Sequence, residues 1–295
     1  MTDSTITRRD FLRTTAAAAV AGTVMMPLLA DQEEKKKAKV ILIRHKNVID
    51  QDGKVNRTII EEMADEAMTT LFNVGSAGEA WKKIVTPKDI VGIKTNVWRY
   101  LRTPLELEQT MKTRIMAAGV LESNIGIDDR GVLNNPLFTG ATVLVNARPM
   151  RAHNWSGVGG CLKNHIMFTP NPPDYHPDSC IDLGALWKLP IVKGKTRLNI
   201  LVMLTPQFHC IGPHQFDKEF TWQYKGMIVG TDPVAVDTVG LKIIEAQRTL
   251  YFKEVTPMRP PVRHITAAEE KHGIGIANMN NIDIIRLGWK EDSLI

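Results

Sequence analysis

The sequence predicts an α/β fold: a layered, mainly parallel sheet with helices on both faces. Short runs rich in Val and Ile alternate along the chain with longer segments in which apolar residues recur at helical spacing. The runs are apolar at consecutive positions, as expected for strands that are covered on both faces. Alternating strands and helices of this kind favour a parallel sheet, and no internal repeat is visible in the chain.

The predicted strands are the apolar runs themselves. They are short and rich in branched residues, and they are separated by segments of different character, which favours strands over buried helices. In chain order, strands are predicted over residues 40–43, 90–93, 125–127, 142–145, 198–204, 227–229 and 282–285.

Three segments between these runs predict helices. Apolar residues from Ile59 to Leu71 recur at helical spacing after Asn56, whose side chain can cap a helix. A second helix is predicted over 105–118, ending at Gly119, because glycine favours the position after a helix. A third helix is predicted over 232–247.

Two segments predict long loops. Residues 166–190 are rich in Pro, Asn and Asp, and residues 251–263 carry three prolines. Loops of this length often form a lid or a rim around a binding site.

Composition excludes several classes of protein. Of the 295 residues, 43% are apolar and 23% are charged, close to the globular average, so collagen-like, disordered and multi-span membrane proteins are excluded. A net charge of +5 is too small and too evenly spread to indicate nucleic-acid binding, although it permits an anionic small molecule. The three cysteines form no Cys-x-x-Cys pair, so an iron–sulfur centre would need ligands from outside the chain.

The N-terminal segment resembles a twin-arginine export signal. Arg8 and Arg9 precede Phe11-Leu12 and a weakly apolar stretch that ends near Ala30. The alternative is a membrane anchor, but the stretch is short for a hydrocarbon core of roughly 30 Å, so no stable membrane span is expected. The predicted organisation is a signal peptide over 1–30, a charged tether over 31–38 and a single α/β domain over 39–295, exported to the periplasm or cell envelope.

Polar residues that follow the apolar runs are the first candidates for a site, because ligands of such sheets bind beyond the carboxyl ends of the strands. Lys94-Thr95-Asn96 follows one run directly. A cation and an amide donor at that place suit an anion, and the alternative is a surface lysine beside a turn.

The segment 146–165 is the richest in candidate residues. It combines cationic and amide side chains with a Gly-rich turn whose backbone amides could hold an anion. It matches neither the P-loop nor the dinucleotide-binding pattern, so a carboxylate, a phosphate or a flavin phosphate is the expected ligand. The alternative is a packed turn with solvated charges. The candidates are Arg148, His153, Gly159, Gly160, Lys163, Asn164 and His165.

Cys161 and His165 lie four residues apart in this segment. On a helix they would share a face and could form a thiolate–imidazolium pair. The alternative is a buried and unreactive cysteine.

A metal site is a further hypothesis for His209, Cys210 and His214, which follow the run over 198–204. A fourth ligand could come from His176, Cys180 or Asp182 in the long loop. The alternative is a polar loop without a metal.

Two acidic residues begin the predicted helix at 232. Asp232 can cap that helix, or bind the ligand as part of the same strand end. Asp237 falls among valines, and a carboxylate on an apolar face needs a partner such as Lys94, Arg148 or Lys163.

Taken together, these segments resemble the domain of unknown function 362 family. The resemblance rests on Val91–Asn96, on the Gly-Gly-Cys-Leu-Lys-Asn-His string ending at His165, on Gly230–Asp237 and on the ending 268–288. Members often accompany ferredoxin-like modules, which implies an iron–sulfur or flavin-associated redox role. This sequence departs from those members because it lacks a Cys-rich module. Its segment 205–214 keeps Gly212-Pro213 but lacks the acidic, Gly-rich form.

The sequence therefore predicts an exported enzyme that binds an anionic ligand or cofactor, with redox chemistry first and hydrolytic or transfer chemistry second. The sequence does not identify a cofactor: a flavin, an externally liganded iron–sulfur centre and a metal are the candidates, the expected partner is a small anionic molecule, and a redox protein is a candidate partner. The alternative is a non-catalytic envelope protein or accessory subunit that binds a small anion or metal. The candidate catalytic residues are His153, His165 and Asp237; the candidate ligand-binding residues are Lys94, Asn96, Arg148, Gly159, Gly160, Lys163, Asn164 and Asp232.

Overall fold

Apolar runs form strands throughout the part of the chain that the computed structural model describes, residues 37–210 and 216–295. The runs predicted over 40–43, 198–204 and 227–229 extend at both ends, those over 125–127, 142–145 and 282–285 extend at the C-terminal end, and the strand predicted over 90–93 lies one residue later. The strands are β1 (Ala38–Arg44), β2 (Val91–Lys94), β3 (Ile125–Asp128), β4 (Val143–His153), β5 (Gly157–Gly159), β6 (Thr196–Gln207), β7 (Gly226–Gly230) and β8 (Ile282–Gly288).

Helices of very different lengths connect these strands. The long ones are those that the apolar spacing predicts, and the short ones lie in segments without a clear period. They are α2 (Arg57–Phe72), α3 (Ala77–Trp81), α4 (Leu105–Ala117), α5 (Pro136–Thr139), α6 (Cys161–Asn164), α7 (Pro177–Cys180), α8 (Pro233–Phe252) and α9 (His264–Glu270), with 3-10 turns η1 (Glu122–Asn124), η2 (His165–Phe168), η3 (Pro172–Tyr175), η4 (Ile181–Lys188), η5 (Lys218–Phe220) and η6 (Met279–Asn281).

The expected signal peptide over 1–30 and residues 31–36 of the expected tether lie outside the described residues. β1 already includes Ala38, the last residue of that tether. Lys37–Ile295 forms one unit by its internal contacts. Within the described residues, no helix combines the length and the apolar character that crossing a membrane requires.

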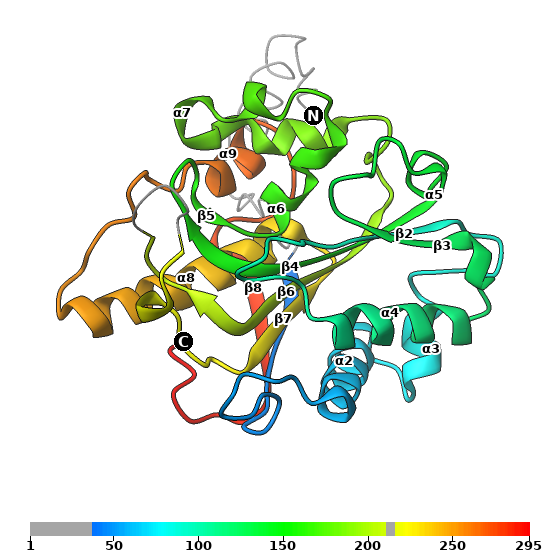
Figure 1. The fold of residues 1–295 in the computed structure, drawn as a ribbon, viewed down its shortest axis with the longest axis horizontal. Helices are drawn as coiled ribbons and strands as arrows, with labels where there is room; N and C mark the ends of the chain where they lie inside the picture. The colour runs from blue at the N-terminus through cyan, green and yellow to red at the C-terminus, as the bar shows by residue number, and fades with distance from the viewer. Residues whose placement is uncertain (1–36, 211–215) are drawn as a thin grey trace, which may run out of the picture. The chain divides into compact units, whose positions relative to one another are not determined.

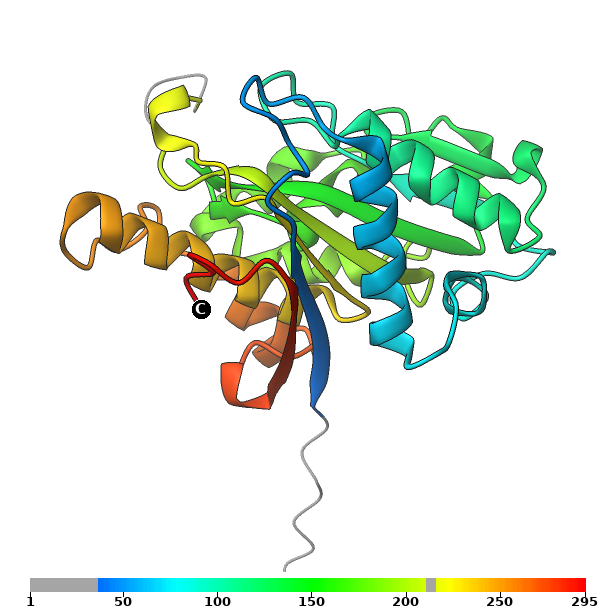
Figure 2. The same cartoon turned by 90° about the horizontal axis from the view of Figure 1, so that it is seen from below.

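The sheet is mainly parallel, as predicted. Its described strands are arranged in the order β3-β2-β4-β6-β7-β1-β8, with β5 paired to β4 (Figure 1). β3, β2, β4 and β6 run parallel to one another. β7 is antiparallel to both of its neighbours, so β1 and β8 run in the same direction as β6. Figure 2 shows the blue β1 and the red β8 side by side.

Helices cover both faces of the sheet and create two apolar cores. Alternate residues of β1 divide between them: Val40 and Leu42 belong to one core, Ile41 and Ile43 to the other. α8 and α6 supply the first core, and α2, α3 and α4 supply the second. In Figure 1, α2, α3 and α4 lie together on one side of the strands and α6, α7 and α9 on the other. The fold is therefore the predicted layered α/β arrangement.

One predicted strand end is wrong. The run over 142–145 does not stop before Arg148, because β4 continues to His153 and stays paired with β6. The register shifts between Pro149 and Arg151, which is an irregularity within the ladder. Arg148 and His153 consequently lie on a strand and not on the loop after it.

Candidate anion-binding site

A row of polar side chains crosses the centre of the sheet. Lys94 of β2 lies opposite Asn146 of β4, which in turn lies opposite Asn199 of β6. The Asn146 Nδ2 donates to Asn199 Oδ1 at 2.9 Å, and the Asn164 Nδ2 of α6 donates to Asn146 Oδ1 at 2.8 Å. Asn199 Nδ2 donates to the Thr231 carbonyl at 3.2 Å. Asn164 Nδ2 also donates to the Lys94 carbonyl at 3.2 Å, so these bonds connect β2, β4, β6, α6 and the residue before the cap of α8; we call this polar row the floor.

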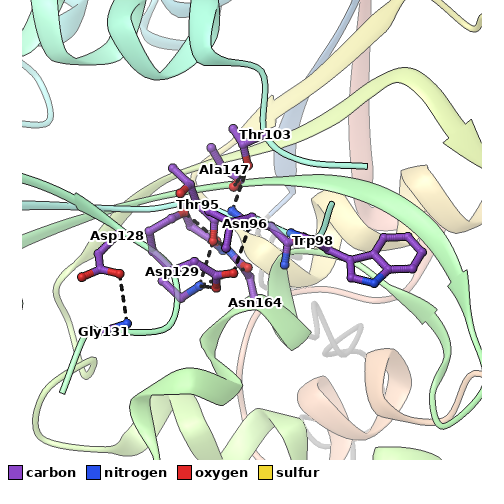
Figure 3. Close-up of polar contacts among 12 residues, drawn as sticks. Thr95, Asn96, Trp98, Thr103, Asp128, Asp129, Gly131, Ala147 and Asn164 are labelled. Atoms are coloured by element: carbon purple, nitrogen blue, oxygen red, sulfur yellow. Dashed lines mark hydrogen bonds and ion pairs between the residues drawn. The ribbon is translucent and has the colours of Figure 1, made fainter. Parts of the chain in front are cut away.

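Lys94 is fully buried and paired with Asp129, which follows β3. Its Nζ lies 2.5 Å from Asp129 Oδ1 and also donates to the Thr95 carbonyl at 2.8 Å. The second oxygen, Asp129 Oδ2, accepts the Val97 amide at 3.0 Å. Figure 3 shows Asp129 and Asn164 side by side at this point, with Trp98 directed away from them. Burial lowers the pKa of Lys94 to about 8, although the charge of Asp129 opposes that effect.

Asp237 supports the start of α6 from the first turns of α8. Its Oδ1 and Oδ2 accept the backbone amides of Cys161 at 2.6 Å and Leu162 at 2.8 Å. A Cβ at Gly160 would lie only 2.3 Å from Asp237 Oδ1, so glycine is required for this approach. Burial raises the pKa of Asp237 to about 6, and the two hydrogen bonds from the backbone amides oppose that rise. Asp237 therefore occupies backbone amides of the Gly-rich turn that were expected to hold the ligand.

Three cationic side chains gather next to this floor and form no ion pair within the described residues, although the charges of Asp129 and Asp237 act on one of them, Arg148. Arg148, Arg151 and Lys163 are only 4%, 7% and 3% exposed. The guanidinium of Arg148 lies against Gly159, where a Cβ would be 2.7 Å from Nη2, and its Nε has no hydrogen-bond partner within 37–210 and 216–295. In the described part of the chain, no carboxylate lies within ion-pair distance of any of the three. We call Arg148, Arg151 and Lys163 the cationic cluster.

The contacts of the other two members are weak. The Nε of Arg151 has no partner, its Nη1 lies 3.5 Å from the Ala152 carbonyl, and its guanidinium stacks on Trp98 at 3.9 Å from the ring centre. Lys163 Nζ donates to Cys180 Sγ at 3.4 Å. Burial lowers the pKa of Lys163 to about 8 and that of Arg151 to about 9, and the nearby charge of Arg148 lowers both further. Their positive charges are thus held close together at a cost in free energy.

His153 lies beside the cationic cluster at the end of β4. Its Nδ1 accepts the Trp155 amide at 3.2 Å. Burial, followed by the charges of Arg151 and Lys163, holds the pKa of His153 well below its usual range. The imidazole is consequently neutral near pH 7, and because its Nδ1 accepts the Trp155 amide, its Nε2 carries the N–H and can donate a hydrogen bond.

His264, the first residue of α9, lies in the same surroundings, although no sequence pattern indicates it. It is fully buried, and among the residues that the structure describes neither ring nitrogen has a hydrogen-bond partner. Burial lowers the pKa of His264 to about 3, and the charges of Lys163 and Arg148 lower it further. A single histidine after a Pro-rich segment carries no sequence signal for a site, so only the three-dimensional arrangement reveals it.

His165 has different surroundings from His153. Its ring stacks on Trp187 with centroids 4.2 Å apart, and its Nε2 lies 2.9 Å from Thr196 Oγ1. Cys161 does not form the expected pair with it, because its contacts are with Asp237. Burial raises the pKa of the Cys161 thiol well above its usual range, which corresponds to the unreactive alternative.

Two of the candidate ligand-binding residues serve local structure. Asp232 caps α8, where its Oδ1 accepts the Val234 and Ala235 amides at 2.9 and 3.0 Å. Asn96 Oδ1 accepts the Trp98 amide at 3.3 Å within a turn. The structure thus brings Lys94, Arg148, His153, Gly159, Gly160, Lys163, Asn164 and Asp237 to one region, and it places Asn96, His165 and Asp232 in other roles nearby.

The predicted metal ligands are placed only in part. His209 Nδ1 lies 3.1 Å from Arg248 Nη1, and its ring packs against Phe220 and Phe252. Cys210 is half-buried, and His214 lies outside the described residues. No group of three His, Cys, Asp or Glu side chains within 37–210 and 216–295 is arranged to hold a metal ion. The three-residue metal site stays a prediction.

One cavity of about 350 Å³ lies apart from the cationic cluster. Its lining includes Tyr100, Arg102, Leu204 and Pro149, the residue between Arg148 and Met150 on β4. Val202 and Leu204 belong to the core on the α2 and α4 face. The cavity therefore lies on the face of the sheet opposite to that of Lys94 and Asn164.

Comparison with known proteins gives a partial match. The model of a domain of unknown function, DUF362, matches residues 131–242. This span includes Arg148, Lys163 and Asp237, whereas Lys94 and His264 lie outside it. The match supports the family resemblance over the central strands and α8. Searches of curated proteins and of solved structures find no significant match.

Proposed function

We propose that this protein is an exported enzyme that binds a small anionic ligand or cofactor at the cationic cluster. The carrying observation is that Arg148, Arg151 and Lys163 are buried together without a carboxylate in ion-pair distance among the described residues. Removing a charge from water costs several kcal/mol, about 3 to 5 when the partner of a buried pair is missing. A bound anion would offset that cost and would accept hydrogen bonds from the unpartnered Nε groups of Arg148 and Arg151.

The chemistry we propose at this site uses His153 for proton transfer once the anion is bound, because a negative charge beside the imidazole would raise its lowered pKa. The cationic side chains would stabilise negative charge that develops on the ligand, and Lys94, Asn146 and Asn164 would hold the floor beneath it. Redox chemistry is the proposed reaction class, supported by the family resemblance. A flavin would supply electron transfer and its phosphate would suit the cationic cluster, whereas an iron–sulfur centre would take its ligands from a partner redox protein.

Native mass spectrometry and absorbance of the full-length protein test this proposal. We expect the wild-type protein to carry an anionic small molecule, and Arg148→Met to lose it because the guanidinium would contact it directly. Arg286→Met, an exposed arginine on β8, should keep it. A flavin or iron–sulfur spectrum would support the redox class. Protein that carries no anion and takes up none in titration would refute the proposal.

A second candidate function is a non-catalytic anion-binding protein of the cell envelope. It is favoured by the roles of Asp237 and His165, two candidate catalytic residues whose contacts hold α6 and pack against Trp187. A colourless protein loaded with an unmodified anion would favour this function over redox catalysis.

A further inference from the structure

His264 is the most completely isolated polar side chain beside the cationic cluster. Its side chain is inaccessible to solvent, and both ring nitrogens lack a partner in the described part of the chain. The segment before it is held firmly: a Cβ at Gly157 would lie 2.6 Å from Val262 Cγ2 and 2.7 Å from the Pro260 carbonyl oxygen. The loop that precedes α9 therefore packs directly against the turn between β4 and β5.

The charge state of His264 limits what it can bind. Burial lowers its pKa to about 3, and Lys163 and Arg148 lie close enough to oppose protonation. A neutral imidazole has one N–H donor and one nitrogen that can only accept. The donor can bind an anionic oxygen, but the accepting nitrogen requires a hydroxyl or another donor. Neither Arg148 nor Lys163 is bonded to it.

The other unpartnered groups need hydrogen-bond acceptors, whereas one ring nitrogen of His264 needs a donor. Arg148 Nε and Arg151 Nε are donors without acceptors, and Lys163 Nζ has only a weak sulfur acceptor. A single small molecule satisfies all of them only if it presents several charged oxygens and at least one hydrogen-bond donor, and a hydroxyl group on the same oxyanion is the simplest such donor.

We infer that the ligand of this site is a small oxyanion that also carries a hydroxyl group, which donates to a ring nitrogen of His264. This inference rests on the proposed anion-binding function and specifies its ligand class. Hydrogen phosphate and 2-hydroxy carboxylates are the simplest members. An anion with acceptors only would leave the buried nitrogen unpaired and should bind about tenfold more weakly or worse.

Isothermal titration of the full-length protein with matched anions tests this inference. Inorganic phosphate and sulfate have the same shape and nearly the same charge at pH 7.5, but only phosphate keeps a hydroxyl. Glycolate and acetate form an equivalent pair of carboxylates. We expect a preference of about tenfold or more for the hydroxyl-bearing member of at least one pair, and the pair that shows it assigns phosphate or carboxylate.

Variants at position 264 separate recognition from folding. His264→Leu should remove the preference, and His264→Gln should keep it because the amide oxygen accepts a hydroxyl. His45→Leu, at a histidine after β1, is the matched control and should behave as wild type. Equal binding within both pairs, or a preference that survives in His264→Leu, would overturn the inference and leave anion binding intact. Failure of all four anions to bind would refute both.

Discussion

Lys163 is the residue of the cationic cluster through which pH should control binding. Burial lowers its pKa to about 8, so its positive charge is lost as the pH rises through that value. Anion affinity should be constant below pH 7 and should begin to fall as the pH passes about 8, because the unbound lysine then deprotonates.

Titration of glycolate between pH 7 and pH 10 checks this expectation, because the charge of this carboxylate does not change over that range, whereas inorganic phosphate titrates near pH 7. Lys163→Met should bind about ten- to hundredfold more weakly at pH 7, the loss of one charge-assisted hydrogen bond, and should show a smaller decrease above pH 8. A residual decrease is expected from Lys94 and Arg151, whose pKa values are lowered to about 8 and about 9. An unchanged pH profile in Lys163→Met would show that another group controls binding.

Single residues differ in how far the sequence could predict them. Arg148, Lys163 and Asn164 could be proposed because they cluster in one segment beside a strand. Asp129 could not, because only the parallel pairing of β2 with β3 brings it to Lys94. His264 arrives from beyond α8, and no local pattern records that approach.

At the scale of elements, α6 is the short helix on which the site depends. Its first amides bind Asp237, and Gly160 provides the space for that contact. Gly160→Ala would place a Cβ 2.3 Å from Asp237 Oδ1, so the carboxylate must move. Its hydrogen bonds with the Cys161 and Leu162 backbone amides would then be lost. We expect the free energy of unfolding to fall by about 2 to 4 kcal/mol.

Urea unfolding followed by tryptophan fluorescence measures this effect. Gly78→Ala in α3 is the control, because nothing lies within 4 Å of a Cβ there. That variant should be neutral or stabilised by up to about 1 kcal/mol. Equal stability of Gly160→Ala and wild type would mean that the hydrogen bonds of Asp237 with α6 do not require a glycine at position 160.

Elements with a strong period were predictable, and short ones were not. The helix over 57–72 and its Asn56 cap follow from apolar spacing and cap chemistry, with Asn56 Oδ1 accepting the Ile59 amide at 3.3 Å. α5, α6 and β5 have three or four residues each, too few to show a period. The end of β4 was misjudged because polar residues such as Arg148 continue the strand where pairing with β6 compensates.

At the scale of the whole molecule, the proposal of export rests on the N-terminal segment, which lies outside the described residues. Replacing Arg8 and Arg9 together by Lys should keep the protein in the cytoplasm, because the twin-arginine pair is the recognised feature. Arg13→Lys is the matched control and should be exported normally. Immunoblotting of cell fractions provides the measurement, and unchanged export of the double variant would exclude this route.

The order of the strands also bears on when the chain can leave its site of synthesis. β1 is made first among the described strands, yet its neighbours β7 and β8 are made last. β1 therefore cannot join the sheet until β7 is made, and its outer edge stays unpaired until β8 emerges, since such distant pairing forms late. A transporter that accepts only folded proteins would then export this chain only after β8 has joined the sheet. A variant that lacks β8 should therefore remain in the cytoplasm.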